Sequence, residues 1–316
     1  MTPSNENANK WPELSYARDR ETFETLHLWS QIVGKVRLAL TPWLNHSWHV
    51  PLYLGARGLT TSLIPHSVAG FDLEFDFISG TLALRTSAGA TDSLALQSGS
   101  IASFHADLLK MLDTNGVAVK IHGAPNEIPD AVPFAEDVAL RRYDPDAARR
   151  LWQALLSIDA VFKRFRTGFL GKSSPVHFFW GSFDLAMAFF SGRPAPEHPG
   201  GSPYLPDDVT RDAYSHEMFD AGFWPGSPDM PNPSFFSYAY PEPPGFRDGR
   251  KLPDGARFDK ELEEYVFPYD LVRTAPDPEQ LLLKFLQTTY DLAADTGHWD
   301  RAALDSELGK PGVVRR

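Results

Sequence analysis

Apolar residues recur at steps of three and four in four stretches of the chain, which is the spacing of one helix face. The clearest stretch opens with Asp144 and Pro145, a favourable N-cap and first helical residue, and predicts a helix over residues 145–170. Its long apolar stripe, with Phe162 in the middle, is typical of a core helix. The other predicted helices cover residues 19–41, 100–114 and 277–297.

Strict alternation of apolar and polar residues marks FDLEFDF, residues 71–77, as a strand. Its Phe and Leu side chains should be buried on one face, and its three acidic side chains should be exposed on the other. A two-residue turn would pair it with residues 81–86 and place Glu74 opposite Arg85. Further strands are predicted at 48–56, 93–97, 117–122, 176–180, 183–190 and 235–240.

The order of these elements indicates the fold class. Strand runs bracketed by helices, without regular β-α-β alternation, predict an α+β fold with mainly antiparallel sheet packed with four main helices. We expect a single unit over residues 11–306, and its halves, 11–143 and 144–306, are candidates for an internal duplication because each has a helix followed by strands. Residues 1–10 are expected to be disordered and 307–316 to form a loose tail.

Charge and composition exclude several kinds of function. The formal net charge is -11 at pH 7 and no run of Lys and Arg occurs, so nucleic acid is not an expected partner. The chain has 0 Cys, which excludes disulfides, thiolate nucleophiles and cysteine-ligated zinc. Because no apolar run could span a bilayer and the N-terminus lacks a signal-peptide layout, we expect a cytoplasmic protein with no membrane partner.

Residues 194–253 are rich in Pro and Gly and carry many interleaved aromatic residues. A long irregular region in a compact protein is usually functional or disordered, and abundant aromatic residues argue against disorder. We therefore predict that this region is an ordered cap over a cleft.

Eight motifs distributed along the chain resemble one known family. They are WPEL at 11–14, ETLHLWSQIVGKVRL at 24–38, WHVPLYLGARGLTT at 48–61, SPVHFFWGSFDLA at 174–186, HPGG at 198–201, AYSHE at 213–217, GFWPG at 222–226 and YAYPEPPGF at 238–246. Together they resemble a family of bacterial proteins catalogued only as a domain of unknown function. The resemblance implies one family-length unit and brings no activity, cofactor or catalytic residue with it.

The segment SPVHFFWGSFDLAMAFFSG, residues 174–192, carries His177 and Asp184 in apolar surroundings, where polar groups need partners. If a two-residue turn separates two strands here, Phe179 faces Asp184 and His177 faces Ala186. His177 and Asp184 are then diagonal neighbours within reach of a hydrogen bond. Such a pair suits general base catalysis, and the alternatives are a structural His-Asp pair or a short helix in place of the second strand.

Weaker candidates lie near AYSHE, residues 213–217, where the pattern predicts the end of a short helix. That helix would bring Asp212 and His216 to i, i+4 spacing, as part of a site or as an exposed pair. A metal site formed by His177, His216 and Glu217 requires these three side chains to converge in space. The sequence identifies neither a metal nor a cofactor.

Two polar stripes are interpreted as solvent-facing. His27, Gln31 and Lys35 lie on one face of the first predicted helix, where an ordinary exposed face is the preferred interpretation. The acidic residues of FDLEFDF could bind a cation, but a solvated strand face is the simpler reading.

Two classes of function remain. The first is a small-molecule enzyme of hydrolase or lyase type that uses acid-base chemistry in an aromatic-capped cleft, and its candidate catalytic residues are His177, Asp184, His216 and Glu217. The second is a non-catalytic protein that binds a small molecule or a carbohydrate. The candidate ligand-binding residues are His49, Trp180, Trp224, Tyr238, Tyr240 and Glu242. Convergence of His177, His216 and Glu217 would favour catalysis, and dispersed histidines would favour binding. The oligomeric state is not defined by the sequence.

Overall fold

The protein has an α+β fold, as its sequence predicts, with two antiparallel sheets of six strands each. The computed structural model describes residues 10–66, 69–202, 204–228, 230–249, 251–307 and Lys310. The N-terminal sheet has the order β1-β2-β4-β5-β6, with β3 also paired to β4, and the C-terminal sheet has the order β11-β12-β10-β9-β8-β7. The disorder predicted at the N-terminus and most of the predicted C-terminal tail lie outside the described residues.

The elements alternate between helices and groups of strands. The helices are α2 (Tyr16–Leu40), α3 (Ile101–Thr114), α4 (Pro145–Arg166), α5 (Asp207–Ala213), α6 (Tyr269–Arg273), α7 (Pro278–Thr296) and α8 (Arg301–Leu304), with 3-10 turns η1 (Asn45–Ser47) and η2 (Phe246–Asp248). The N-terminal sheet contains β1 (Tyr53–Leu54), β2 (Gly58–Thr60), β3 (Ile64–His66), β4 (Ala69–Asp76), β5 (Thr81–Thr86) and β6 (Thr91–Ala95). The C-terminal sheet contains β7 (His177–Phe179), β8 (Asp184–Pro194), β9 (His216–Trp224), β10 (Ser234–Tyr240), β11 (Arg257–Asp259) and β12 (Glu264–Pro268).

The four helices predicted from apolar spacing are confirmed as α2, α3, α4 and α7. The N-cap of α4 is Asp144, whose carboxylate accepts a 2.9 Å hydrogen bond from the amide of Asp146. This helix ends at Arg166, four residues before the predicted end, and Phe162 on its buried face is 0% exposed. Within the described part of the chain, no helix is long and apolar enough to cross a membrane.

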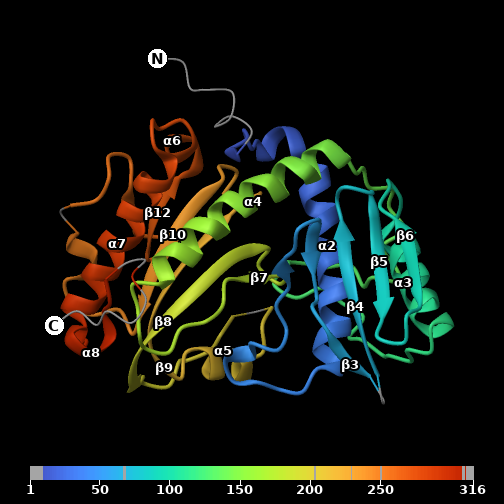
Figure 1. Ribbon diagram of the computed structural model, residues 1–316, viewed down its shortest axis with the longest axis horizontal. Helices are drawn as coiled ribbons and strands as arrows, with labels where there is room; N and C mark the ends of the chain where they lie inside the picture. The colour runs from blue at the N-terminus through green and yellow to red at the C-terminus, as the bar shows by residue number, and fades with distance from the viewer. Residues whose placement is uncertain are drawn as a thin grey trace.

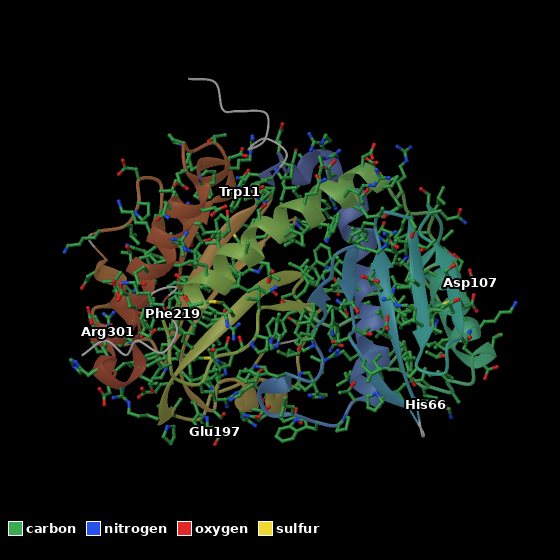
Figure 2. The ribbon with its side chains drawn as sticks, in the orientation of Figure 1. Trp11, His66, Asp107, Glu197, Phe219 and Arg301 are labelled. Atoms are coloured by element: carbon green, nitrogen blue, oxygen red, sulfur yellow. The ribbon has the colours of Figure 1, made fainter. Side chains whose placement is uncertain are left out.

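One face of the C-terminal sheet packs against α4 and α7. Figure 1 shows α4 crossing this sheet and continuing toward the N-terminal sheet, with α7 beside it. Phe219 of β9, labelled in Figure 2, lies 5.7 Å from the ring of Tyr290 of α7, and Phe189 of β8 stacks on Phe165 of α4. Because side chains alternate along a strand, the residues between these positions face the opposite side of the sheet.

A backbone bridge joins the two sheets. The amides and carbonyls of Leu52 and Phe178 exchange two 2.9 Å hydrogen bonds, so the start of the N-terminal sheet continues the edge of the C-terminal one. Each half of the chain thus supplies a long helix and a six-stranded antiparallel sheet, but the strand orders differ. An internal duplication stays a prediction.

The hairpin of β4 and β5 forms with a register two residues away from the predicted one. Asp72, not Glu74, is paired with Arg85. The reason is a longer turn, in which Asp76 accepts hydrogen bonds from the amides of Ile78 and Ser79 at 2.9 Å. All four apolar side chains of FDLEFDF are buried, as predicted.

The prediction that the acidic face of this strand is exposed is wrong. Glu74 and Asp76 are only 6% and 7% exposed. Two arginines cover them: Arg85 lies 2.6 Å from Glu74, and Arg57 lies 2.6 Å from Asp76. These carboxylates are occupied by ion pairs, which leaves no open cation site.

Three further expectations need correction. No strand forms at 117–122, and the strand predicted at 48–56 contracts to β1. Residues 194–253 are not one irregular cap, since they contain α5, β9 and β10. The short helix α5 ends at Ala213 and His216 begins β9, so Asp212 and His216 do not share a helix face.

Candidate functional site

The hairpin predicted around His177 and Asp184 forms with the predicted register. Phe179 faces Asp184 and His177 faces Ala186 in the β7-β8 pair. Ser182, in the turn between the strands, donates a short hydrogen bond to the Asp184 carboxyl group. The hairpin therefore presents an oriented carboxyl group on the sheet face that points away from α4.

The predicted hydrogen bond between His177 and Asp184 does not form. His177 is 0% exposed, and neither of its ring nitrogens has a hydrogen-bond partner among the described residues. Tyr53 and Phe179 pack edge-on against the imidazole, with ring centroids 5.5 Å and 5.3 Å away. Burial, reinforced by the charges of two arginines, lowers the pKa of His177 to about 3. His177 is a neutral core residue, and it does not line the cavity described next.

A cavity of about 460 Å³ lies on the face of the C-terminal sheet opposite α4. Its floor comes from alternate residues of neighbouring strands, chiefly Asp184 of β8, Asp220 and Trp224 of β9, Phe236 and Tyr238 of β10 and Glu264 of β12. Its cover comes from η1, the loop at residues 126–127 and the region of α5. Figure 1 shows α5 beside the segment that contains η1. Three of the predicted ligand-binding residues, Trp180, Trp224 and Tyr238, line this cavity.

Three carboxyl groups are buried on the cavity floor. Asp220 is 8% exposed, and no hydrogen bond or ion pair reaches its carboxyl group within the described chain. Glu264 has a buried oxygen, Oε2, that also lacks a hydrogen-bond partner in the described residues. Tyr238 of β10 is paired with Asp220 and separates the two acids. Unpartnered buried carboxyl groups are costly, so their presence in a cavity calls for a functional explanation.

The environment raises the pKa of each of these acids. Burial, and then the charge of Glu127, raise the pKa of Asp184 to about 7. Burial and the neighbouring carboxyl groups raise the pKa of Asp220 well above its ordinary value and that of Glu264 to about 8. At neutral pH, Asp220 and Glu264 therefore hold their protons, whereas Asp184 is close to half titrated.

A fourth carboxyl group, that of Glu127, enters the cavity from the loop. Burial raises the pKa of Glu127 to about 6, and the charge of Lys35 opposes this effect. Lys35 of α2 donates a short hydrogen bond to the side-chain oxygen of Asn126, and burial lowers the pKa of this lysine to about 8. A Cβ atom at Gly181 would overlap the Glu127 carboxyl group, so a glycine is needed there for the loop to approach the hairpin.

The polar stripe on α2 supports the site and is not its solvent-facing surface, so that interpretation is wrong. His27 donates a 2.7 Å hydrogen bond from Nε2 to the carbonyl oxygen of Gly181. Gln31 is 0% exposed and exchanges hydrogen bonds with the backbone of Asn126 at 2.8 Å and 2.7 Å. The stripe therefore fixes both the hairpin turn and the loop that carry cavity residues.

Aromatic rings form one wall of the cavity. Trp224 stacks on Phe236 with ring centroids 4.2 Å apart, and Phe236 lies nearly parallel to Tyr238 at 6.4 Å. The hydroxyl groups of Tyr214 and Tyr238 are 2.9 Å apart. Gly222 makes this stack possible, because a Cβ atom there would overlap the Phe236 ring. The cavity thus combines ring faces with acids, a lining that suits a small ligand.

Comparison with known families gives one match. Residues 11–306 match DUF5996, described as a family of unknown function. The chain belongs to the DUF5996 family. No curated protein matches it, and no solved structure does. The match covers the predicted family-length unit and confirms the resemblance noted in the sequence.

Strained backbone gathers at the cavity of this DUF5996 chain. His46 and Ser47 in η1 and Glu127 in the loop have φ values of 58°, 54° and 58°, in the left-handed region that residues other than glycine rarely adopt. All three line the cavity. Strain of this kind persists where surrounding structure enforces it, and it is concentrated at functional sites.

The remaining predicted site residues of the DUF5996 chain are dispersed. His49 is buried and accepts a 3.2 Å hydrogen bond from the amide of Leu44. His216 does not line the large cavity. Glu217 lies beside a second cavity of about 230 Å³, together with Tyr240 and Glu242. His177, His216 and Glu217 do not converge, and no group of three or more His, Asp or Glu side chains in the described chain is arranged to hold a metal ion.

Sequence reasoning missed three of the four cavity acids. Asp220 lies in an apolar run, MFDAGFW, and this is the same signal that identified Asp184. The run was overlooked because the preceding segment was interpreted as the end of a helix. Glu264 follows other acidic residues and Glu127 lies in a loop, so neither carries a local signal; only strand pairing brings them to the site.

Proposed function

We propose that the protein is a small-molecule enzyme of hydrolase or lyase type that transfers protons with carboxyl groups in the large cavity. The observation that carries the proposal is the burial of Asp184, Asp220 and Glu264 on neighbouring strands, beneath aromatic walls. Titratable groups with strongly shifted pKa values in a cleft are typical of catalytic sites. The histidine chemistry suggested by the sequence is not part of this proposal.

The acids would divide the work according to their protonation. Asp184, with a pKa raised to about 7, can accept or donate a proton at neutral pH, and Ser182 orients it. Asp220 and Glu264 hold their protons at that pH, so they would donate hydrogen bonds to the substrate. Two acids in different protonation states within one cavity suit paired general acid and base catalysis.

A second candidate function is non-catalytic binding of a small molecule or a carbohydrate. The dispersal of His177, His216 and Glu217 favours it, since the sequence-based criterion linked catalysis to their convergence. The same cavity would serve both functions.

One experiment separates the two candidates. The purified protein is incubated with the small-molecule fraction of a cell extract, and mass spectrometry follows which compounds disappear and which are retained by the protein on ultrafiltration. For an enzyme, at least one compound is depleted by the wild type and by the control Asp107→Asn, but not by Asp184→Asn. Asp107 is exposed on α3, far from the cavity (Figure 2). Retention without depletion would favour the binding protein, and neither result would contradict both.

Other features remain predictions of the sequence. They are a small-molecule partner, a cytoplasmic location and the absence of nucleic-acid and membrane partners.

A further inference from the structure

We propose that the ligand of the large cavity is an organic cation, an amine or a quaternary ammonium compound, held between the carboxyl groups of Asp184, Asp220 and Glu264 and the stacked rings of Trp224 and Phe236. This inference rests on the proposed function, because it names the substrate class of the same cavity.

The charge balance of the lining is the first argument. Four acids line the cavity, Glu127 in addition to the three on the floor, whereas the described lining contains neither Lys nor Arg. Lys35 lies behind this surface, and its ammonium group is engaged with Asn126. An anionic ligand would meet these acids without a compensating cation, so the lining selects against it.

The second argument is the state of the acids themselves. The carboxyl group of Asp220 is more than nine-tenths buried and has no hydrogen bond or ion pair within the described residues. Oε2 of Glu264 is likewise buried without a partner in the described chain. Both belong to residues that line the cavity, so a ligand with positive charge or N–H groups would satisfy them.

The aromatic wall is the third argument, because the faces of Trp, Tyr and Phe rings attract cations. Other rings of the lining already do so from the protein side. Lys172 lies 5.1 Å from the ring centroid of Trp48, and Lys35 lies 5.4 Å from that of Trp180. Trp224 and Phe236 have no such partner among the described residues, and together with Asp220 they form the free part of a cage.

A neutral polyol fits the lining less well. Sugars need donors as well as acceptors, and the amide of Asn126 is already engaged with Lys35. The hydroxyl group of Ser174 donates to the carbonyl oxygen of Pro175, and that of Ser182 donates to Asp184. Carboxyl groups therefore dominate the polar groups left for a ligand.

Cation binding should depend on pH. As the acids lose their protons above neutral pH, the cavity becomes more negative and affinity for a cation rises. The titratable groups that face or adjoin these acids are Lys35 from α2, His46 from η1, Glu127 from the loop, Tyr214 after α5, Tyr238 from β10 and Asp259 from β11. Burial lowers the pKa of His46, which keeps this residue from adding positive charge at neutral pH.

Choline and 3,3-dimethylbutan-1-ol are matched probes, because they have nearly the same shape and only choline is charged. Isothermal titration at about pH 8 should show choline binding at least about tenfold more tightly than the alcohol. Asp220→Asn should weaken choline binding about tenfold or more and leave the alcohol unaffected, because it removes only the charge. Lowering the pH to about 5 should also weaken choline binding about tenfold, since neither probe titrates there.

Asp107→Asn is the control for charge at a distance, and Glu264→Gln is a second cavity variant; thermal denaturation confirms that each variant is folded. Equal binding of choline and the alcohol, no choline binding, or choline binding that neither cavity variant changes would overturn the cation assignment. Those results would leave the proposed enzyme standing if a neutral compound were depleted from the extract. Selective choline binding without depletion of any compound would instead contradict the enzyme and retain the cation site.

Discussion

Replacing Asp184 with Asn should make the protein more stable at neutral and alkaline pH, because the buried acid is destabilising when it ionises. The pKa of Asp184 is raised from 3.8 to about 7, mainly by burial. In the unfolded chain the group loses its proton near its ordinary pKa, whereas the folded protein holds the proton until about pH 7. The unfolded state is therefore favoured progressively as the pH rises between these two values, and the effect levels off above pH 7.

The size of the effect follows from the same values. A difference of about three pH units, at about 1.36 kcal/mol for each, sets an upper limit of about 4 kcal/mol. Water in the cavity reduces this figure, so we expect Asp184→Asn to raise the free energy of unfolding by about 2 to 4 kcal/mol at pH 8. At pH 4 both states are largely protonated, and the gain should be below about 1 kcal/mol. The amide oxygen can still accept the hydrogen bond from Ser182.

Urea denaturation of wild type and variant at about pH 4, 6 and 8 measures this dependence. Asp107→Asn, on the exposed face of α3, removes one carboxylate without altering the cavity and should show no comparable trend. A loss of stability that is the same at every pH would refute the reasoning, because it would make Asp184 a structural hydrogen-bond acceptor. A stabilised variant that no longer turns over substrate would show that the acid is kept for function at the expense of stability.

Three further predictions concern the core and the cavity wall. Phe162→Ala should lower the free energy of unfolding by about 3 to 5 kcal/mol, because Phe162 is 0% exposed and its loss leaves a cavity; a change below about 1 kcal/mol on urea denaturation would contradict its core position. Gly222→Ala should displace the ring of Phe236, since the added Cβ would overlap it and lie 2.7 Å from the carbonyl oxygen of Leu185; choline affinity measured by titration should fall while the far-UV circular dichroism is retained, and unchanged affinity would exclude this ring from the site. His177→Leu should leave stability unchanged or raise it by about 1 kcal/mol, because both ring nitrogens lack partners among the described residues; a loss above about 2 kcal/mol in thermal denaturation would show that the imidazole makes a stabilising interaction.

Local patterns in the sequence predict local structure well. The caps and apolar spacing of α4 and α7 give their N-terminal ends correctly, and alternation in β4 identifies its buried face. Alternation does not tell whether the second face is covered. Arg57 and Arg85 bury the acids of that face, and neither contact is visible before the strands are paired.

The candidate site shows the same boundary between local and tertiary information. The hairpin of Phe179 and Asp184 has its predicted register because a short turn determines it. The partner of Asp184 could not be predicted in this way: the imidazole of His177 is enclosed by aromatic rings, and the acid instead meets carboxyl groups from β9 and β12. These strands are far apart in the sequence, and only the strand order of the sheet brings Asp220 and Glu264 to one cavity.

The most direct measurement is a crystallographic screen in which crystals of the protein are soaked with a library of small fragments that includes amines, neutral alcohols and carboxylic acids. If the large cavity is the functional site, bound fragments should concentrate there, with amines against Asp220 and the ring of Trp224 and with carboxylic acids absent. Fragments that cluster elsewhere on the surface, with only ordered water in the cavity, would contradict a functional role for it.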